Sequence, residues 1–303
     1  MNRIQITGIL PALVSPVNED GSIRKAALRK LVRDLARTGI SGFYLCGATG
    51  EGIAMAPERR MELVEIVKDE APSGMKLINH IGAADLATVR RLARHSRQIG
   101  LDAISSVPPF FFSYDEKGVL DYYRAMAEAS EGLPLLVYAC PLSGTPLPVS
   151  TIEKMLDIPG FLGMKYTNPD YYKMSRYKKI DGGNINILNG PDETCALGLL
   201  MGADGAIGST YNVMPRLFVK LFAAVKEGRA DEALRLQMRA DEVIECMLRY
   251  DVISCVKLLL SDMGYDVGEP NAPLKCLSEK EKTAFRASIR ALDLSETLGL
   301  QEA

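Results

Sequence analysis

The feature that most restricts the fold of this chain is an alternation, repeated eight times, of short apolar runs and longer segments with helical periodicity. Each run is apolar almost throughout, which is typical of a parallel strand buried on both faces. The predicted strands are Ile9–Val14, Gly42–Cys46, Lys76–Ile81, Ala103–Val107, Pro134–Tyr138, Phe161–Lys165, Asn184–Leu188 and Asp204–Gly208. Eight strand–helix units are the number that closes into a (β/α)8 TIM barrel, an α/β fold.

The segments between the strands carry apolar stripes of helical spacing. The first stripe consists of Leu86, Val89, Leu92 and Ala93, and the second of Phe218, Leu221, Phe222 and Val225. Ser150 and Glu153 have the spacing of a capping box and predict a helix start. An open, doubly wound sheet is the structural alternative, but no G-x-G-x-x-G follows the first strand. The barrel is therefore the favoured fold.

The strand pattern stops after residue 228. Three helices are predicted beyond it, over Ala230–Arg249, Val252–Met263 and Glu279–Ala291. We therefore expect residues 1–228 to form the barrel and residues 229–303 to form a C-terminal helical extension packed on it.

Composition narrows the class of protein. Lys and Arg number 36 and Asp and Glu 38, a net charge of −2, so no basic surface for nucleic acid or an anionic membrane is predicted. The first residues lack the layout of a signal peptide, and no apolar stretch approaches the ~18 residues of a membrane span, so we expect a soluble, cytoplasmic protein. Six cysteines without a C-x-x-C pair and only two histidines argue against disulfides and a metal site. We expect neither a metal nor an organic cofactor.

Lys165 is the main candidate for chemistry. It closes the apolar segment 158–164, where partial desolvation disfavours the ammonium and leaves a nucleophilic amine that forms Schiff bases. The alternative is a lysine at a strand end that extends to water or pairs with a carboxylate. In a barrel of this kind the active site lies at the carboxyl ends of the strands, which favours the catalytic interpretation.

Other strand ends carry polar or flexible residues. Strand two runs into Gly47–Gly52, a turn whose amides suit a carboxylate at least as well as a phosphate, unless it is an ordinary glycine turn. Tyr138 ends strand five beside strand six, so its phenol is a candidate proton carrier next to Lys165, or simply an aromatic lining the barrel. His80 ends another apolar run and is a candidate for lining a cavity.

Strands seven and eight end in segments that suit a polyhydroxylated ligand. Asp192 and Glu193 follow strand seven, and Ser209 follows strand eight. The two acidic residues equally fit the first turn of a helix. The glycine-rich turn after strand eight also fits a phosphate cup, which leaves a phosphosugar enzyme open.

Together these segments resemble the pyruvate-dependent class I aldolase family that contains N-acetylneuraminate lyase and dihydrodipicolinate synthase, over nearly the whole chain. The resemblance implies a barrel with a C-terminal helical region, usually a homotetramer. It also implies that Lys165 forms the Schiff base with the 2-oxo carbon and that Tyr138 transfers the proton at the carbon–carbon bond. The amides of Ala48 and Thr49 would bind the pyruvate carboxylate.

Within this family the chain looks like the lyase branch. The stretch Lys165-Tyr166-Thr167 and the blocks Asn189–Glu193 and Gly208–Asn212 carry that likeness. It implies that Thr167, Gly190, Asp192, Glu193 and Ser209 bind the sugar-like part of the substrate. The implied activity is cleavage of N-acetylneuraminate, or a related 2-oxo sugar acid, to pyruvate and an aldose such as N-acetylmannosamine.

Two alternatives remain at this point. Dihydrodipicolinate synthases tend to carry an arginine after the strand-five motif, and Tyr138–Gly144 contains none, but a synthase or another aldolase of the family stays open. The family's turn after strand two usually carries Ser or Thr where this chain has Ala48. That missing hydroxyl keeps open a pyruvate-binding regulatory protein that forms the imine without turnover.

Overall fold

The computed structural model describes residues 5–292, so the ends of both predicted regions, 1–4 and 293–303, lie outside the described residues. All eight predicted strands are present: β1 Gly8–Pro11, β2 Gly42–Leu45, β3 Lys76–His80, β4 Ala103–Ser106, β5 Leu135–Ala139, β6 Phe161–Tyr166, β7 Asn186–Asn189 and β8 Gly205–Gly208. They belong to one sheet in the order β1-β8-β7-β6-β5-β4-β3-β2. The Leu13 amide donates to the Tyr44 carbonyl at 3.0 Å, so the chain just after β1 pairs with β2. The prediction of a (β/α)8 barrel is confirmed.

A helix follows each strand. The helices are α1 Lys25–Ala36, α2 Pro57–Glu70, α3 Leu86–Gln98, α4 Glu116–Ala129, α5 Val149–Met155, α6 Tyr171–Lys178, α7 Cys195–Leu200 and α8 Pro215–Lys226. The predicted stripe of α3 buries Val89, Leu92 and Ala93, whereas Leu86 is half-buried. Asp85 caps this helix by accepting a hydrogen bond from the Thr88 amide at 2.7 Å.

The capping box predicted at Ser150 is wrong. Helix α5 begins at Val149, and Pro148 is the residue that precedes it. The proline fixes its own φ and has no amide to satisfy, so the helix starts earlier and Ser150 lies within its first turn. A complete capping box is present instead at the start of α11 (Glu279–Arg290), between Ser278 and Glu281.

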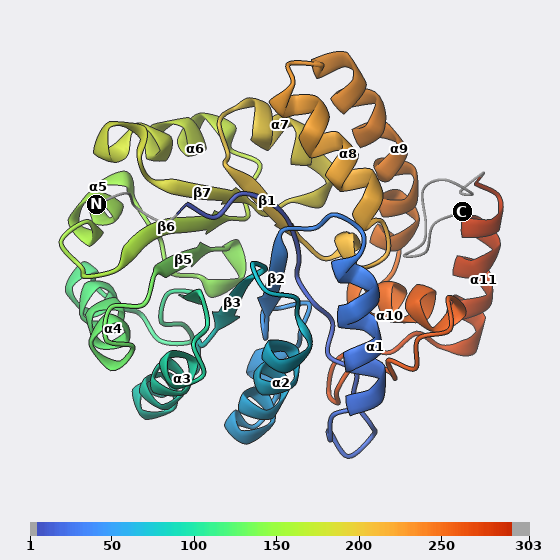
Figure 1. Ribbon diagram of the computed structural model, residues 1–303, viewed down its shortest axis with the longest axis horizontal. Helices are drawn as coiled ribbons and strands as arrows, with labels where there is room; N and C mark the ends of the chain where they lie inside the picture. The colour runs from blue at the N-terminus through green and yellow to red at the C-terminus, as the bar shows by residue number, and fades with distance from the viewer. Residues whose placement is uncertain (1–4, 293–303) are drawn as a thin grey trace. The chain divides into compact units, whose positions relative to one another are not determined.

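Residue packing divides the chain into two compact units. The first runs from Lys76 to Ile207 and includes residues 5–7. Within it, β3 to β7 lie side by side as parallel strands in the order of the chain, as Figure 1 shows in teal to yellow. Because each strand connects to its neighbour through a helix, the carboxyl ends of these strands share one edge.

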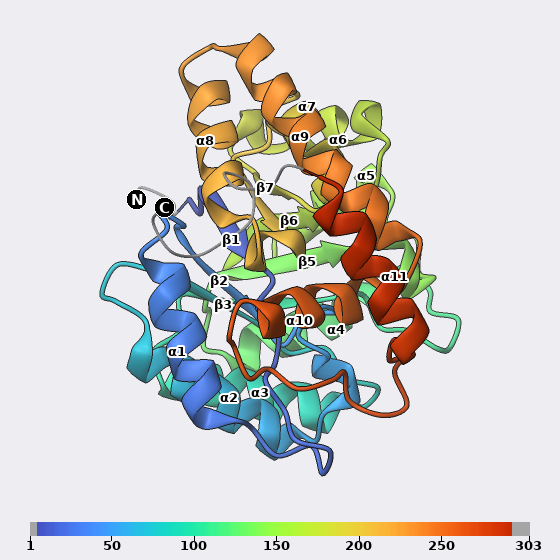
Figure 2. The same ribbon diagram turned by 90° about the vertical axis from the view of Figure 1, so that its right-hand side faces the viewer.

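The second unit comprises Gly8–Met75 and, within the described residues, 208–292. It contains the predicted C-terminal helices, observed as α9 Ala230–Leu248, α10 Val252–Asp262 and α11. Helix α9 packs against α8, α10 and α11, and Figure 2 shows α9 and α11 side by side. Within residues 5–292, none of the helices combines the length and the hydropathy that crossing a lipid bilayer requires.

A β-bulge sets the pairing of β5 with β6. Leu135 lies opposite Phe161 but Leu136 lies opposite Gly163, so β6 contains one extra residue at this point. Gly163 has φ +155°, and a Cβ there would approach the Asn186 backbone nitrogen to 2.7 Å, so only glycine fits. Since a slip of one residue exchanges the faces of a strand, this bulge determines which β6 side chain lies beside Tyr138.

Candidate active site

Lys165 lies in β6 and is buried, with 5% of its surface exposed. Its neighbours in the sheet are Tyr138 of β5 and Leu188 of β7. Burial lowers the pKa of Lys165 to about 8, because the ammonium loses its hydration, while the Asp192 carboxylate and Cys140 oppose the shift. At pH 7 about a tenth of this amine is therefore unprotonated and nucleophilic, far more than for a lysine with the ordinary pKa of 10.5.

Tyr138 lies directly beside this amine. Because of the bulge, Tyr138 pairs with Lys165 in the register of β5 and β6, and the Lys165 Nζ atom lies 4.3 Å from the centre of the tyrosine ring. Burial raises the pKa of the Tyr138 phenol; Cys140 adds to this rise, and the Thr167 hydroxyl opposes it. The ring of His80 meets the tyrosine ring edge-on at 6.1 Å between centroids. The amine and the phenol are thus held as a close pair.

Thr167 and Gly190, which follow β6 and β7, extend the backbone pairing of these strands beyond their ends. The Thr167 amide donates to the Ala139 carbonyl at 2.9 Å, and the Gly190 amide donates to the Tyr166 carbonyl at 2.8 Å. A Cβ at Gly190 would collide with the Thr167 side chain, so glycine is required for this close approach.

Asp192 and Glu193 differ in their surroundings. Both lie in the 3-10 helix Asp192–Thr194, as the alternative interpretation of their positions suggested. Asp192 is buried and acts electrostatically on Lys165, whereas Glu193 is exposed to solvent. Of the two carboxylates, only Asp192 is brought to the amine within this unit.

The turn Gly47–Gly52 lies in the second unit. The Glu51 amide donates to the Ala48 carbonyl at 2.9 Å and the Gly52 amide to the Gly47 carbonyl at 3.1 Å, which closes the turn. Ala48 is exposed and Thr49 is buried. Within the described residues, the Ala48 and Thr49 amides have no backbone acceptor. They are consecutive donors at the end of a strand, which is the arrangement that binds small anions.

Ser209 belongs to the same unit as this turn. The hydroxyl groups of Ser209 and Thr49 form a hydrogen bond of 2.6 Å. Ser209 therefore lies at the turn, and the two hydroxyls, predicted separately to bind different parts of the substrate, contact each other directly.

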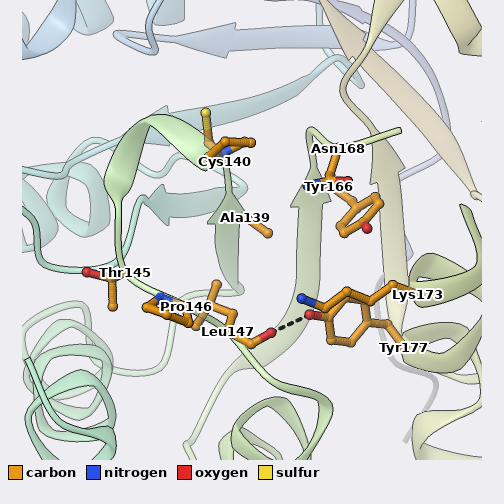
Figure 3. A pocket seen from close by; sticks show the side chains of 10 residues that line it. Ala139, Cys140, Thr145, Pro146, Leu147, Tyr166, Asn168, Lys173 and Tyr177 are labelled. Atoms are coloured by element: carbon orange, nitrogen blue, oxygen red, sulfur yellow. Dashed lines mark hydrogen bonds between the residues drawn. The ribbon is translucent and has the colours of Figure 1, made fainter. Parts of the chain in front are cut away.

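A cavity of about 160 Å³ lies near the same strand ends (Figure 3). Ala139 of β5 and Tyr166 of β6 line it, together with Cys140, Asn168, Lys173 and Tyr177 among others. Successive residues of a strand face opposite sides, so Ala139 and Tyr166 point away from the side that carries Tyr138 and Lys165. On its far wall the Tyr177 hydroxyl donates to the Leu147 carbonyl. Lys165 and Tyr138 are not among the residues that line this cavity, whereas Cys140 lines it and also acts on both of them.

Sequence reasoning missed Cys140 and the contact of His80. Cys140 influences both Lys165 and Tyr138, and the signal for it was its position, two residues after Tyr138 and so on the same face of the chain. His80 accepts a hydrogen bond from the Val107 amide at 3.2 Å and packs on Tyr138. Its place at the end of β3 was recognised, but its partner was not.

The fold and the buried amine together define a (β/α)8 protein with a nucleophilic lysine in a barrel strand. Comparison with known proteins narrows this class. The chain belongs to the dihydrodipicolinate synthetase family, whose model matches residues 5–292.

Its similarity to particular proteins is also extensive. It is 36% identical over 259 residues to N-acetylneuraminate lyase of Escherichia coli O1:K1, covering 85% of this chain and 87% of the relative. The structure of Proteus mirabilis N-acetylneuraminate lyase matches with a TM-score of 0.88 at 29% identity, covering 95% of this chain and 99% of that one. CdNal of Clostridium difficile, solved in complex with mannosamine, matches with a TM-score of 0.90 at 29% identity, over 95% and 99% of the two chains. The predicted family and its lyase branch are confirmed.

Proposed function

We propose that this protein is a Schiff-base aldolase that cleaves N-acetylneuraminate, or a related 2-oxo sugar acid, to pyruvate and an aldose such as N-acetylmannosamine. The observation that carries the proposal is the buried Lys165 amine, with a pKa lowered to about 8, against the ring of Tyr138. The similarity to N-acetylneuraminate lyases supports the same reaction. The lysine itself supplies the electron sink, so the reaction requires no organic cofactor.

The proposed reaction begins with the neutral Lys165 amine. It attacks the C2 carbonyl of the open-chain substrate. Loss of water, with one proton given by the Tyr138 phenol, leaves an iminium ion beside the Tyr138 phenolate. The Tyr138 phenolate then takes the proton of the C4 hydroxyl, the C3–C4 bond breaks, and its electrons move into an enamine. The aldose leaves, and the enamine takes a proton at C3 from Tyr138. Water then hydrolyses the iminium to pyruvate and the free amine, and the proton released returns to the Tyr138 phenolate.

Different residues are proposed to bind the two ends of the substrate. The amides of Ala48 and Thr49, which have no backbone acceptor within the described residues, are proposed to bind the pyruvate carboxylate. Thr167, Gly190, Asp192, Glu193 and Ser209 are proposed to bind the hydroxylated part. The mannosamine bound to the similar CdNal supports an aminosugar as the aldose.

Borohydride reduction in the presence of pyruvate tests the proposal. The iminium carries a reducible C=N bond, so we expect a stable adduct on the Lys165 peptide, detected by mass spectrometry. Lys173, which lines the neighbouring cavity, is the internal control and should remain unmodified. Absence of the Lys165 adduct would contradict the Schiff-base chemistry itself.

A substrate screen then separates the proposed lyase from its alternatives. We expect pyruvate release from N-acetylneuraminate, followed continuously with lactate dehydrogenase and NADH. Activity with pyruvate and aspartate semialdehyde alone would instead establish a synthase. An adduct on Lys165 without turnover of any sugar acid would establish the regulatory, non-catalytic protein.

We also propose a cytoplasmic homotetramer, as the family resemblance implies. Sedimentation velocity at micromolar concentration measures the assembly state directly. A monomer or dimer there would contradict the tetramer without affecting the chemistry proposed for Lys165.

A further inference from the structure

Glu51 occupies an unusual place in the turn Gly47–Gly52. Its backbone is left-handed, with φ +56° and ψ +24°, a conformation that favours glycine or asparagine. Its side chain is fully buried. A glutamate in this position carries both backbone strain and the cost of burying a charge, so its contacts indicate what the side chain does there.

The carboxylate of Glu51 is held by Lys257 and Asn271, in the C-terminal part of the chain. Its Oε1 atom lies 2.5 Å from the Lys257 ammonium of α10, and the lysine side chain is 1% exposed. Its Oε2 atom accepts hydrogen bonds from the Asn271 backbone amide at 2.5 Å and from the Asn271 side chain at 2.9 Å. Lys257 also donates to the Glu269 carbonyl at 3.0 Å. One side chain thus ties the turn to a helix and to the segment 269–271.

Other residues of the turn contact the segment that follows β1 and the segment that follows β8. Ser15 donates to the Gly50 carbonyl at 2.7 Å, and Thr49 shares its hydrogen bond with Ser209. At Gly50 a Cβ would lie 2.8 Å from the Leu13 carbonyl oxygen, so the backbone is packed there without space for a side chain. The turn is fixed on both sides of Ala48 and Thr49, whose amides point to no backbone acceptor within the described residues.

Stability alone does not account for this arrangement. Replacing a buried ion pair by apolar side chains of similar volume is often neutral or stabilising, so Glu51 and Lys257 give the fold little that leucine or methionine would not. The charged pair instead fixes the position and orientation of the Glu51 side chain. An ion pair and two hydrogen bonds on one carboxylate define the position of Glu51, and with it the orientation of the two amides immediately before Gly50.

We propose that Glu51, Lys257 and Asn271 are positioning residues that hold the Ala48 and Thr49 amides in the geometry that binds the substrate carboxylate. The C-terminal helices thereby set the affinity for the 2-oxo acid. This inference rests on the proposed function, because it assumes that the turn binds pyruvate. It assigns no chemical step to the three residues, which act through the turn.

The test uses a double variant, Glu51→Gly/Lys257→Met. Glycine adopts the left-handed backbone without strain, and methionine avoids leaving a buried ammonium without its carboxylate. We measure the pyruvate concentration that gives half-maximal borohydride trapping on Lys165, and we expect it to rise about tenfold or more, the effect of weakening one hydrogen bond to a charged group. In Glu51→Gln/Lys257→Met the amide oxygen still accepts from Asn271, so part of the affinity should return.

Two controls separate positioning from general damage. Acetone has the ketone of pyruvate without its carboxylate, so its trapping on Lys165 should be unchanged in the double variant. Lys282→Met removes an ion pair with Glu269 of the same segment, at 2.8 Å, without touching Glu51, and should leave pyruvate trapping at the wild-type concentration.

Each outcome decides the matter. A shift for pyruvate alone supports the proposal. An unchanged half-maximal concentration, or an equal loss of trapping for pyruvate and acetone, overturns it. Failure of the wild-type protein to form any pyruvate adduct would instead refute the proposed function, so the two failures are distinguishable.

Discussion

Replacing Lys165 by methionine should abolish imine formation and at the same time stabilise the folded protein at neutral pH. Methionine has a similar length and no charge, so it fills the same buried position without a desolvation cost. The protein as it stands keeps an amine where burial disfavours its protonated form. A site that is prepared for chemistry in this way costs stability, and removing the amine should recover it.

The size and sign of the effect follow from the pKa. Burial lowers the pKa of Lys165 from 10.5 to about 8, a difference of about 2.5 units, which corresponds to roughly 3 kcal/mol. Between these two values the unfolded chain binds more protons than the folded one, so stability rises with pH from about 8 to 10.5. Below pH 8 the full cost is present, and above 10.5 it is gone. Lys165→Met should therefore be more stable by roughly 3 kcal/mol at pH 7 but not at pH 10.5.

Urea denaturation gives the free energy of unfolding of the wild-type protein and of Lys165→Met at pH 7 and at pH 10.5. The difference between the two proteins is then compared at the two pH values. At roughly 2 °C per kcal/mol, the melting temperature should also rise by about 6 °C at pH 7. Lys282→Met is the control with opposite sign, because Glu269 and Glu279 raise the pKa of Lys282 and its loss should destabilise. If the gain of Lys165→Met is the same at both pH values, it comes from packing, and the lowered pKa is refuted.

Three further predictions concern the same group of residues. Tyr138→Phe should still give the pyruvate adduct on Lys165 but lose sugar-acid cleavage by about 10²- to 10⁴-fold in kcat, the usual contribution of a proton-transfer group; equal loss of trapping and cleavage would contradict it. Asp192→Asn removes a charge that raises the pKa of Lys165, so the midpoint of its competitive labelling by acetic anhydride should move to lower pH, and an upward movement would refute the assigned electrostatics. Gly163→Ala should lower the free energy of unfolding, measured in urea, by roughly 3 kcal/mol, because its Cβ meets the Asn186 backbone. Gly100→Ala should lower it by only about 1 kcal/mol, because φ is +69° there but no heavy atom lies within 4 Å of an added Cβ.

The order of strands and helices could be predicted from the amino-acid sequence, because parallel strands that are covered on both faces are apolar without interruption. It also predicted that Lys165 and Tyr138 are neighbours, from the order of the strands alone. The bulge at Gly163, which makes this pairing exact in register, was not predicted. An isolated glycine within the apolar run 161–165 was the signal for it.

Contacts between distant parts of the chain were beyond sequence reasoning. Glu51 and Lys257 are 206 positions apart, and neither helical periodicity nor local turn chemistry relates them. Glu193 and Asp192 are adjacent, and the pattern treated them alike, yet one is exposed and the other buried. The two side chains leave the short 3-10 helix Asp192–Thr194 in different directions. Their burial therefore depends on how this helix packs and not on the residue types.

The same burial has opposite consequences for the two groups at the centre of the site. It enlarges the neutral, nucleophilic fraction of the Lys165 amine and makes the Tyr138 phenol a weaker acid, so in the free protein burial disfavours the charged form of both groups. Imine formation changes this balance, because an iminium carries a positive charge at any pH. At the 4.3 Å that separates the Lys165 Nζ atom from the centre of the Tyr138 ring, and with an effective dielectric constant of about 20, that charge stabilises a phenolate by roughly 4 kcal/mol. The positive charge thereby offsets the rise that burial causes in the pKa of the phenol, and it does so only after the substrate is bound covalently, which is the stage at which the proposed mechanism requires a base.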